Sequence, residues 1–418
     1  MMKKQILILI VFLIVFTNLF SLYEIKPIYS ADKAEYIIIC EDQYLESTKS
    51  WSNFLIEELG KKVLSFPISL IFKSSNNELE KCKLLKDFIK DIYDLKGAHY
   101  FLLVGSQIPY MKLYPDGSNS KLLKVPYIYS DLFFSDFSSK WDFDGDEIYG
   151  EINDDRIQFK PEVNIGRLPF SSPEAVENYF KRTISSYIGV KNNNALFAAS
   201  FKQFEHMFSD KYEPKIDNAN FCEDVIKDIG KSYNCYRLYE ADGIQSSKWI
   251  YKSDGCLSKS SINNYLVDIN PLIACFNLKG DTKSLIKTYW TKDLNKNSLA
   301  DTEEVKEEVV FDGNSASEAL NSTFFFSVQA PSLWQEGNDN LSIDVLSKTG
   351  LIFGGNSIDI SELDPSNEIN YAILSYWLKE ILNKTEIGEA LNDTIKNYSE
   401  FYKNIKQNDK FKVVSNLY

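Results

Sequence analysis

Four acidic side chains stand close together in a segment that also contains glycine, and carboxylates spaced in this way can bind a metal ion. Asp142, Asp144 and Asp146 occupy alternate positions, and Glu151 follows five residues later. Hard oxygen ligands at alternating positions, with a glycine for the bend, are typical of calcium loops. The spacing D-x-D-G-D-x-x-x-x-E differs from that of an EF-hand. A calcium site and a solvated acidic turn are therefore both open interpretations.

Cysteine and histidine side chains could supply a nucleophile and a base. A cysteine peptidase needs a thiolate whose proton passes to a nearby imidazole. The last of the six cysteines is Cys275, inside an apolar strand pattern that favours a buried core thiol. The two histidines, His99 and His206, are more typical of structural or surface positions. The sequence has no G-x-S-x-G elbow, no H-E-x-x-H motif, no Cys/His zinc spacing and no P-loop.

Alternating strand and helix patterns must position these groups. Apolar, β-branched runs predict buried strands, and a strong helix is expected from about Asn77, with Gly97 suited to its carboxyl-terminal cap. A strand is also expected over residues 62–72. Such alternation implies βαβ units and a largely parallel sheet. The polar break K-N-N-N at residues 191–194 divides the chain into two expected α/β subdomains, residues 33–190 and 195–418, whereas the acidic segment 290–305 is interpreted as a solvated loop.

One series of motifs in the first half is specific enough to suggest a family. An L-L-V-G strand is followed by a Ser-Asp pair, an acidic loop ending in Gly-Glu, and an I-G-R-L-P strand-to-helix turn, all within residues 100–174. This order resembles the gingipain-type cysteine peptidases, peptidase family C25. The resemblance implies a secreted bacterial protein with a caspase-like α/β fold, in which two subdomains hold mostly parallel sheets flanked by helices. It also implies a His/Cys catalytic dyad.

The catalytic half of the chain departs from that family pattern. In the family the histidine follows the strand that corresponds to residues 272–276, in an N-x-x-G-H-G-like turn, and the cysteine follows the next strand. Here the turn reads N-L-K-G-D-T, which puts Asp281 at the histidine position. The cysteine position falls near Ala330. We therefore expect a peptidase scaffold without catalytic residues. Arg167, in the strand-end turn, is expected to pair with a local carboxylate rather than to act in catalysis.

Composition and the amino-terminal segment limit the number of domains, the kinds of partner and the cellular location that can be expected. The chain has 418 residues, 44% of them hydrophobic, enough for one large or two ordinary domains. Its net charge, 46 − 59 = −13, repels phosphate backbones and argues against nucleic-acid binding. The basic start and apolar run within residues 1–30 predict a secretory signal peptide, so the protein is expected to be secreted or on the cell surface. An uncleaved amino-terminal membrane anchor is the alternative.

Three functional hypotheses follow. The first is an exported gingipain-like domain that has lost its peptidase chemistry and acts as a binding or regulatory module, with a peptide or protein ligand in a groove at the ends of the second sheet. The second is an active cysteine-type endopeptidase that uses Cys275 with a displaced base. The third is a calcium-stabilised surface protein.

Overall fold

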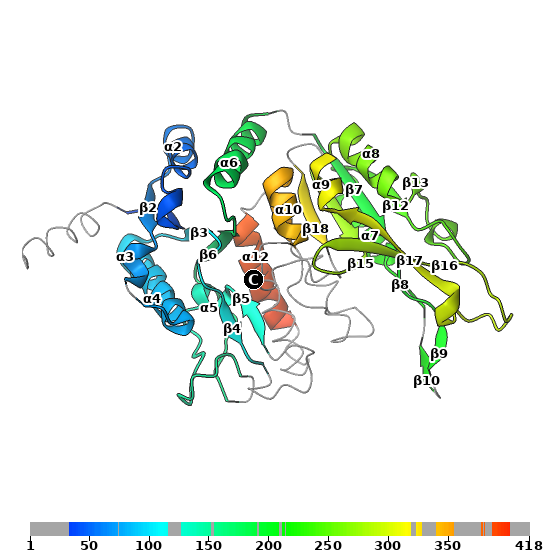
Figure 1. Cartoon of the computed structure of the whole chain (residues 1–418), viewed down its shortest axis with the longest axis horizontal. Coiled ribbons are helices and arrows are strands. Elements are labelled where there is room, and N and C mark those ends of the chain that lie inside the picture. The colour runs from blue at the N-terminus through cyan, green and yellow to red at the C-terminus, as the bar shows by residue number, and fades with distance from the viewer. Residues whose placement is uncertain are drawn as a thin grey trace, which may run out of the picture.

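The computed structural model describes residues 33–73, 75–115, 127–151, 154–189, 192–208, 211–213, 215–318, 323–327, 340–354, 378, 380 and 387–401. Within these ranges two parallel sheets form the centre of the molecule, and Figure 1 shows one in each half, with helices packed around it. Strands that are covered on both faces need apolar residues at successive positions, as the sequence provides. The expected α/β architecture with mostly parallel sheets is confirmed.

The first sheet has the order β2-β1-β3-β6, and all its strand pairs are parallel. Its strands are β1 (Tyr36–Cys40), β2 (Val63–Pro67), β3 (Tyr100–Val104) and β6 (Asn164–Leu168). One face packs on α4 (Glu78–Lys96), and the other packs on two further helices, α2 (Lys49–Glu57) and α6 (Pro173–Ile188). Because successive residues of a strand point to opposite faces, the run Y-I-I-I-C of β1 contributes to both layers.

The long helix of this half begins and ends at the expected residues. Helix α4 (Glu78–Lys96) is capped by Asn77, whose Oδ1 accepts a hydrogen bond from the Glu80 amide at 3.1 Å. That bond satisfies one of the free N–H groups of the first turn. Gly97 ends the helix at a φ of 68°, a left-handed conformation that suits glycine.

The strand expected over residues 62–72 is shorter than predicted. Strand β2 ends at Pro67, and the chain then turns into α3 (Ser69–Phe72). The Asp42 carboxylate accepts a hydrogen bond from the Ser69 amide at 3.2 Å, which holds the start of that helical turn. Ile71 and Phe72, at the end of the predicted strand, are therefore buried on a helix and not in the sheet.

The second sheet has the order β13-β12-β7-β14-β18-β19, again with parallel pairs. Its strands are β7 (Asn194–Ala199), β12 (Asn234–Tyr239), β13 (Gly255–Cys256), β14 (Ile273–Asn277), β18 (Phe324–Ser327) and β19 (Ile352–Gly354). Helix α7 (Ala219–Ile229) packs on one face and α8 (Lys259–Ile269) on the other. In the central register Ala199 lies beside both Tyr239 and Asn277, so β12, β7 and β14 end level at one edge.

An antiparallel unit that packs on the second sheet was not predicted. It consists of β15 (Lys279–Gly280), β16 (Ser284–Trp290) and β17 (Val305–Asp312). The acidic segment that the sequence analysis assigned to a loop does connect β16 to β17. Strand β17 was missed because its start, V-K-E-E-V, stays largely exposed and carries charge.

The last described helix returns to the first sheet. Helix α12 (Ile387–Phe401) lies beside β6, where Asn392 Nδ2 donates a hydrogen bond to the Val163 carbonyl at 3.0 Å, and Figure 1 shows it in red in that half. The division into subdomains of residues 33–190 and 195–418 stays a prediction. Helix α12 belongs to the second range by sequence but packs against the sheet of the first. In the described part of the chain, no helix combines the length and the apolar character that a membrane span requires.

Candidate functional site

The position that the family pattern assigns to histidine holds an aspartate that closes a turn. Asp281 lies between β15 and β16, and its Oδ1 accepts hydrogen bonds from the Lys283 and Ser284 amides, both at 2.8 Å. Aspartate commonly stabilises turns in this way. Within the described ranges, no hydrogen bond joins this carboxylate to a thiol or an imidazole. Ala330, near which the pattern places the nucleophile, lies outside the described residues.

The thiol and the imidazoles considered as substitutes are not brought together. Cys275 is fully buried within β14 and lies beside Cys222 of α7. Burial, and then that neighbouring thiol, raise the pKa of Cys222 well above its ordinary value. His99 is exposed at the amino end of β3, in the other sheet. His206 starts β9 (His206–Phe208), and its side chain lies outside the described part of the structure.

The carboxyl edge of the second sheet holds a buried carboxylate that accepts no hydrogen bond of normal geometry. Glu240 directly follows β12 and is 1% exposed, and its amide donates to the Ala199 carbonyl at 2.9 Å. Among the described residues, neither Oε1 nor Oε2 has a hydrogen-bond partner. Burial raises the pKa of Glu240 to about 7, although the Asp242 amide and the Lys287 ammonium favour its charged form. A buried carboxylate without hydrogen-bond partners destabilises the fold, and groups of this kind are concentrated at functional sites.

The cation whose charge acts on Glu240 is held by other acceptors. Lys287 of β16 has a side chain only 1% exposed, and its Nζ donates to the Asp242 carboxylate and to the Leu257 carbonyl at 3.0 Å. The same Nζ forms an ion pair with Glu308 at 3.5 Å. Three carboxylates therefore act on one ammonium group, and the surroundings of Glu240 carry a net negative charge.

Further polar atoms without partners border the same edge. Asp217, which precedes α7, is 5% exposed. Its Oδ1 accepts hydrogen bonds from Ser247 Oγ at 2.8 Å and from the Ala219 amide at 3.0 Å, whereas its Oδ2 has no partner in the described structure. Ser246 Oγ and Asn277 Oδ1 are also buried, and neither atom has a hydrogen-bond partner among the described residues. Carboxylate and carbonyl oxygens accept hydrogen bonds, so an external group rich in donors would satisfy this edge.

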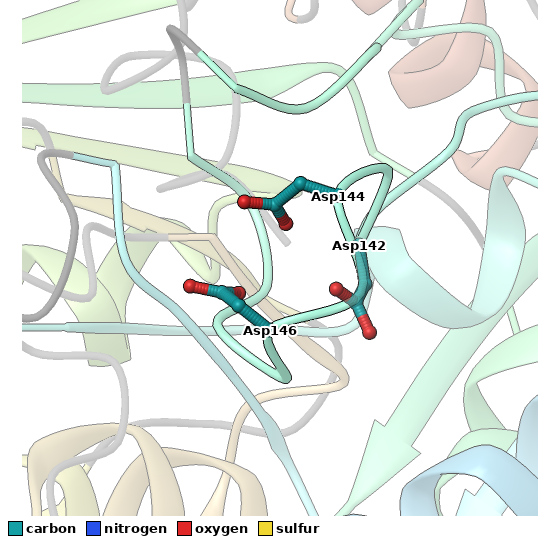
Figure 2. Close-up of side chains that lie close together, drawn as sticks. All are labelled: Asp142, Asp144 and Asp146. Carbon is teal, nitrogen blue, oxygen red and sulfur yellow. The ribbon is translucent and has the colours of Figure 1, made fainter.

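The acidic loop brings three of its four predicted ligands together. Asp142, Asp144 and Asp146 each offer a carboxylate oxygen, and these oxygens lie within 4.8 Å of one another. Figure 2 shows the three side chains around a common space in one loop. The loop is held locally, since Asp142 Oδ1 accepts a hydrogen bond from the Gly145 amide at 3.0 Å. Glu151 is not one of this set.

A buried aspartate that the sequence analysis did not single out organises the backbone of this loop. Asp155 is 7% exposed, and it accepts hydrogen bonds from the amides of Phe143, Gly150 and Glu151 at 2.6, 2.7 and 2.9 Å. Glu151 is itself buried, and burial together with the charge of Asp146 raises its pKa to about 7. The loop therefore carries more negative charge than its surroundings compensate. Calcium binding, with Glu151 as a fourth ligand, stays a prediction.

The arginine of the I-G-R-L-P motif is structural. Arg167 Nε and one terminal nitrogen donate to the two carboxylate oxygens of Asp131 at 2.7 and 2.6 Å. Both side chains are less than one tenth exposed. The guanidinium group also donates to the carbonyls of Ile108 and Pro109. The predicted pairing with a local carboxylate is confirmed.

A cavity of about 430 Å³ lies elsewhere, between the two sheets. Its walls come from β1, β3 and β6 of the first sheet, from β19 of the second, and from α2, α6, α12 and α10 (Leu341–Lys348). Apolar side chains predominate in the lining, and the residues at the carboxyl edge near Glu240 are not part of it. The cavity therefore does not belong to the site suggested by the family pattern.

Three solved structures have a similar fold. A complex of the Porphyromonas gingivalis RgpB pro- and mature domains gives a TM-score of 0.59 at 14% identity, covering 92% of this chain and 77% of that one. The Arg-specific cysteine proteinase gingipain R (RgpB) gives 0.56 at 15%, with 93% and 77% covered. A structure described only as a protease gives 0.55 at 11%, with 92% and 77% covered. At such identities the likeness shows the fold, which confirms the caspase-like, gingipain-like architecture.

The chain belongs to peptidase family C25, because the model of that family matches residues 29–270, more than half of its length. The matched residues end before Asp281, so the membership does not depend on the catalytic positions. No curated protein matches the chain significantly.

Sequence reasoning found the acidic loop but missed the polar edge near Glu240. The segment L-Y-E-A-D-G has the pattern of a strand that ends in a turn, which gives Glu240 no distinguishing mark. The available signal was the parallel order of the strands, because ligands of open α/β sheets bind outside their carboxyl ends. Applied to β12, that rule points to the residue that follows Tyr239.

Proposed function

We propose that this protein is an exported C25-family domain that does not cleave peptides and instead binds a polypeptide segment at the carboxyl edge of the second sheet, with a basic side chain directed to Glu240. The observation that carries the proposal is the buried Glu240 carboxylate, which accepts no hydrogen bond of normal geometry from the described residues. The loss of peptidase chemistry is supported by Asp281, whose carboxylate is used to close a turn.

The chemistry of the edge favours arginine as the bound side chain. A guanidinium group has five N–H donors in a rigid fork, whereas an ammonium group has three. The buried oxygen atoms without a hydrogen-bond partner among the described residues of this edge include both carboxylate oxygens of Glu240, Asp217 Oδ2 and Asn277 Oδ1. A solved structure of the same fold is described as Arg specific, which is a property of that protein and agrees with the choice.

Binding of short peptides tests this function. We expect the purified protein to bind a fluorescein-labelled Ala-Ala-Arg-Ala-Ala peptide, and the Glu240→Gln variant to bind it about thirtyfold or more weakly, because losing one partner of a buried charge pair costs about 2–5 kcal/mol. A peptide with citrulline in place of arginine keeps the shape without the charge and is expected to bind weakly to both proteins. Fluorescence polarisation measures each affinity.

The matched control is Glu307→Gln, which removes a carboxylate that is 46% exposed on β17 and pairs with Lys279. It is expected to leave the affinity unchanged. Equal affinity for the arginine and citrulline peptides, or a Glu240→Gln variant that binds as well as the unaltered protein, would refute the proposed function.

We also propose that the acidic loop binds calcium and stabilises the fold, with Asp142, Asp144 and Asp146 as ligands. The proximity of three carboxylate oxygens supports it, together with the extracellular setting that export would provide. Hard oxygen ligands favour calcium over softer metals. Calcium in this loop would neutralise charge that now opposes the ionisation of Glu151.

The calcium proposal predicts a ligand-dependent gain in stability. At a free calcium concentration a hundred times its Kd, the free energy of unfolding is expected to rise by about 2.7 kcal/mol. Asp144→Asn should remove most of that gain in thermal unfolding followed by calorimetry. Glu147→Gln, in the same loop but outside the three ligands, should keep it. The same calcium-dependent rise in all three proteins would show that the ion binds elsewhere.

A further inference from the structure

Two neighbouring apolar side chains project into solvent next to the edge that carries Glu240. Trp249 is 70% exposed and Ile250 is 56% exposed. Large apolar side chains are usually covered, and tryptophan is among the residues most enriched at the centres of protein interfaces. Their position beside unmet buried carboxylates distinguishes this pair from scattered surface residues.

The loop that carries this pair is bound to the backbone of Glu240 and to the carboxylate of Asp217. The Lys248 amide donates to the Glu240 carbonyl at 3.3 Å, and Ser247 Oγ donates to Asp217 Oδ1 at 2.8 Å. Trp249 follows directly, and its own amide donates to the Ser246 carbonyl at 3.2 Å. Since consecutive residues span at most about 3.6 Å each, the Trp249 backbone lies within about 7 Å of that of Ser247.

Backbone packing fixes this loop before any partner arrives. Gly243 has a φ of 122°, and a Cβ at this position would lie 2.3 Å from the Trp290 carbonyl oxygen. The Ile244 amide donates to that same carbonyl at 2.8 Å. A loop held in one conformation loses little entropy when it binds, which favours an ordered contact surface.

We infer that Trp249 and Ile250 form an apolar subsite beside Glu240, and that it accepts an apolar side chain one or two positions from the arginine of the bound segment. The inference rests on the proposed function. An extended segment advances about 3.3 Å per residue. The Lys248 amide contacts the Glu240 carbonyl and Trp249 is the next residue, so the apolar pair begins one residue from the arginine site.

Charge selects the same kind of partner. Near this loop the carboxylates of Asp242 and Glu308 remain about half exposed, although each also contacts Lys287. The whole chain carries a net charge of −13. A segment that is basic and locally apolar complements both features, whereas an acidic segment would be repelled.

The test uses two labelled peptides, Ala-Ala-Arg-Ala-Ala and Ala-Leu-Arg-Leu-Ala, and their affinities for the purified protein. We expect the leucine peptide to bind about tenfold more tightly, because the subsite covers leucine surface. The Trp249→Ser/Ile250→Ser double variant should bind both peptides with the weaker affinity. Leu294→Ser removes another apolar side chain, 56% exposed on the loop between β16 and β17, and should keep the preference.

The outcomes separate this inference from the proposed function. If the double variant keeps the full preference for leucine, or if the unaltered protein shows no preference while Glu240→Gln still weakens both peptides, the apolar subsite is wrong and the arginine site stands. If Glu240→Gln binds both peptides normally, or neither peptide binds the unaltered protein, the proposed function fails and the subsite fails with it.

Discussion

The Glu240→Gln variant is expected to gain about 3 kcal/mol of stability relative to the unaltered protein as the pH rises from 4 to 8. Burial raises the pKa of Glu240 from 4.5 to about 7, so between these values the folded protein holds a proton that the unfolded chain releases. The unaltered protein therefore loses stability as the pH rises through that range, and the loss is complete above pH 7. Glutamine has no such proton to lose.

Urea unfolding at pH 4, 6 and 8 measures this difference. The free energy of unfolding of the variant minus that of the unaltered protein should increase between pH 4 and pH 8. Saturating arginine peptide at pH 8 should reduce the Glu240 difference by stabilising the unaltered protein. A flat profile for Glu240→Gln would show that the carboxylate has a partner in solution.

The Arg167→Met variant is expected to lose about 3–5 kcal/mol of stability, since it leaves the Asp131 carboxylate buried and unpaired. The pair makes two bonds of 2.7 and 2.6 Å, and its side chains are 8% and 9% exposed. Two backbone carbonyls, of Ile108 and Pro109, would also lose their donors. Peptide binding at Glu240 should survive wherever the variant is folded, because Arg167 lies in the first sheet and Glu240 at the edge of the second.

A double-mutant cycle decides whether the ion pair itself is responsible. The Arg167→Met/Asp131→Asn protein carries no unpaired charge, and it should be more stable than Arg167→Met alone. Denaturant unfolding of the four proteins gives the coupling energy. A loss below about 1 kcal/mol for Arg167→Met would place this pair with the weak surface ion pairs, and would contradict the burial that the structure shows.

Local signals predicted the elements whose ends are fixed by their own sequence. Asn77 and Gly97 bound α4 as expected, because a helix cap is a contact between near neighbours in the chain. The continuous apolar runs predicted parallel strands for the same reason, since a strand that is buried on both faces has apolar residues at successive positions. The prediction of a strand up to residue 72 was wrong, because the Asp42 carboxylate accepts a hydrogen bond from the Ser69 amide and holds the start of a helix there. Asp42 is distant in the sequence, so no local pattern indicates this contact.

The polar edge was hidden because its members come from distant segments. Glu240 follows β12, Lys287 lies within β16 and Asp217 precedes α7, so they come from three separate segments. The strands β12, β7 and β14 end level at the edge where these segments meet. The burial of Lys287 depends on β16, which the sequence analysis did not predict. The acidic loop, by contrast, is local, and spacing alone was enough to group Asp142, Asp144 and Asp146.

The central claim is that this C25-family chain binds peptides without cleaving them. The most direct test is the incubation of a diverse peptide mixture with the purified protein, with calcium and reductant present, followed by mass spectrometry of the products. The Cys275→Ala variant, prepared in parallel, reports contaminating protease. We predict no new cleavage products with either protein. Cleavage by the unaltered protein that disappears in the variant would make Cys275 a nucleophile and contradict the account.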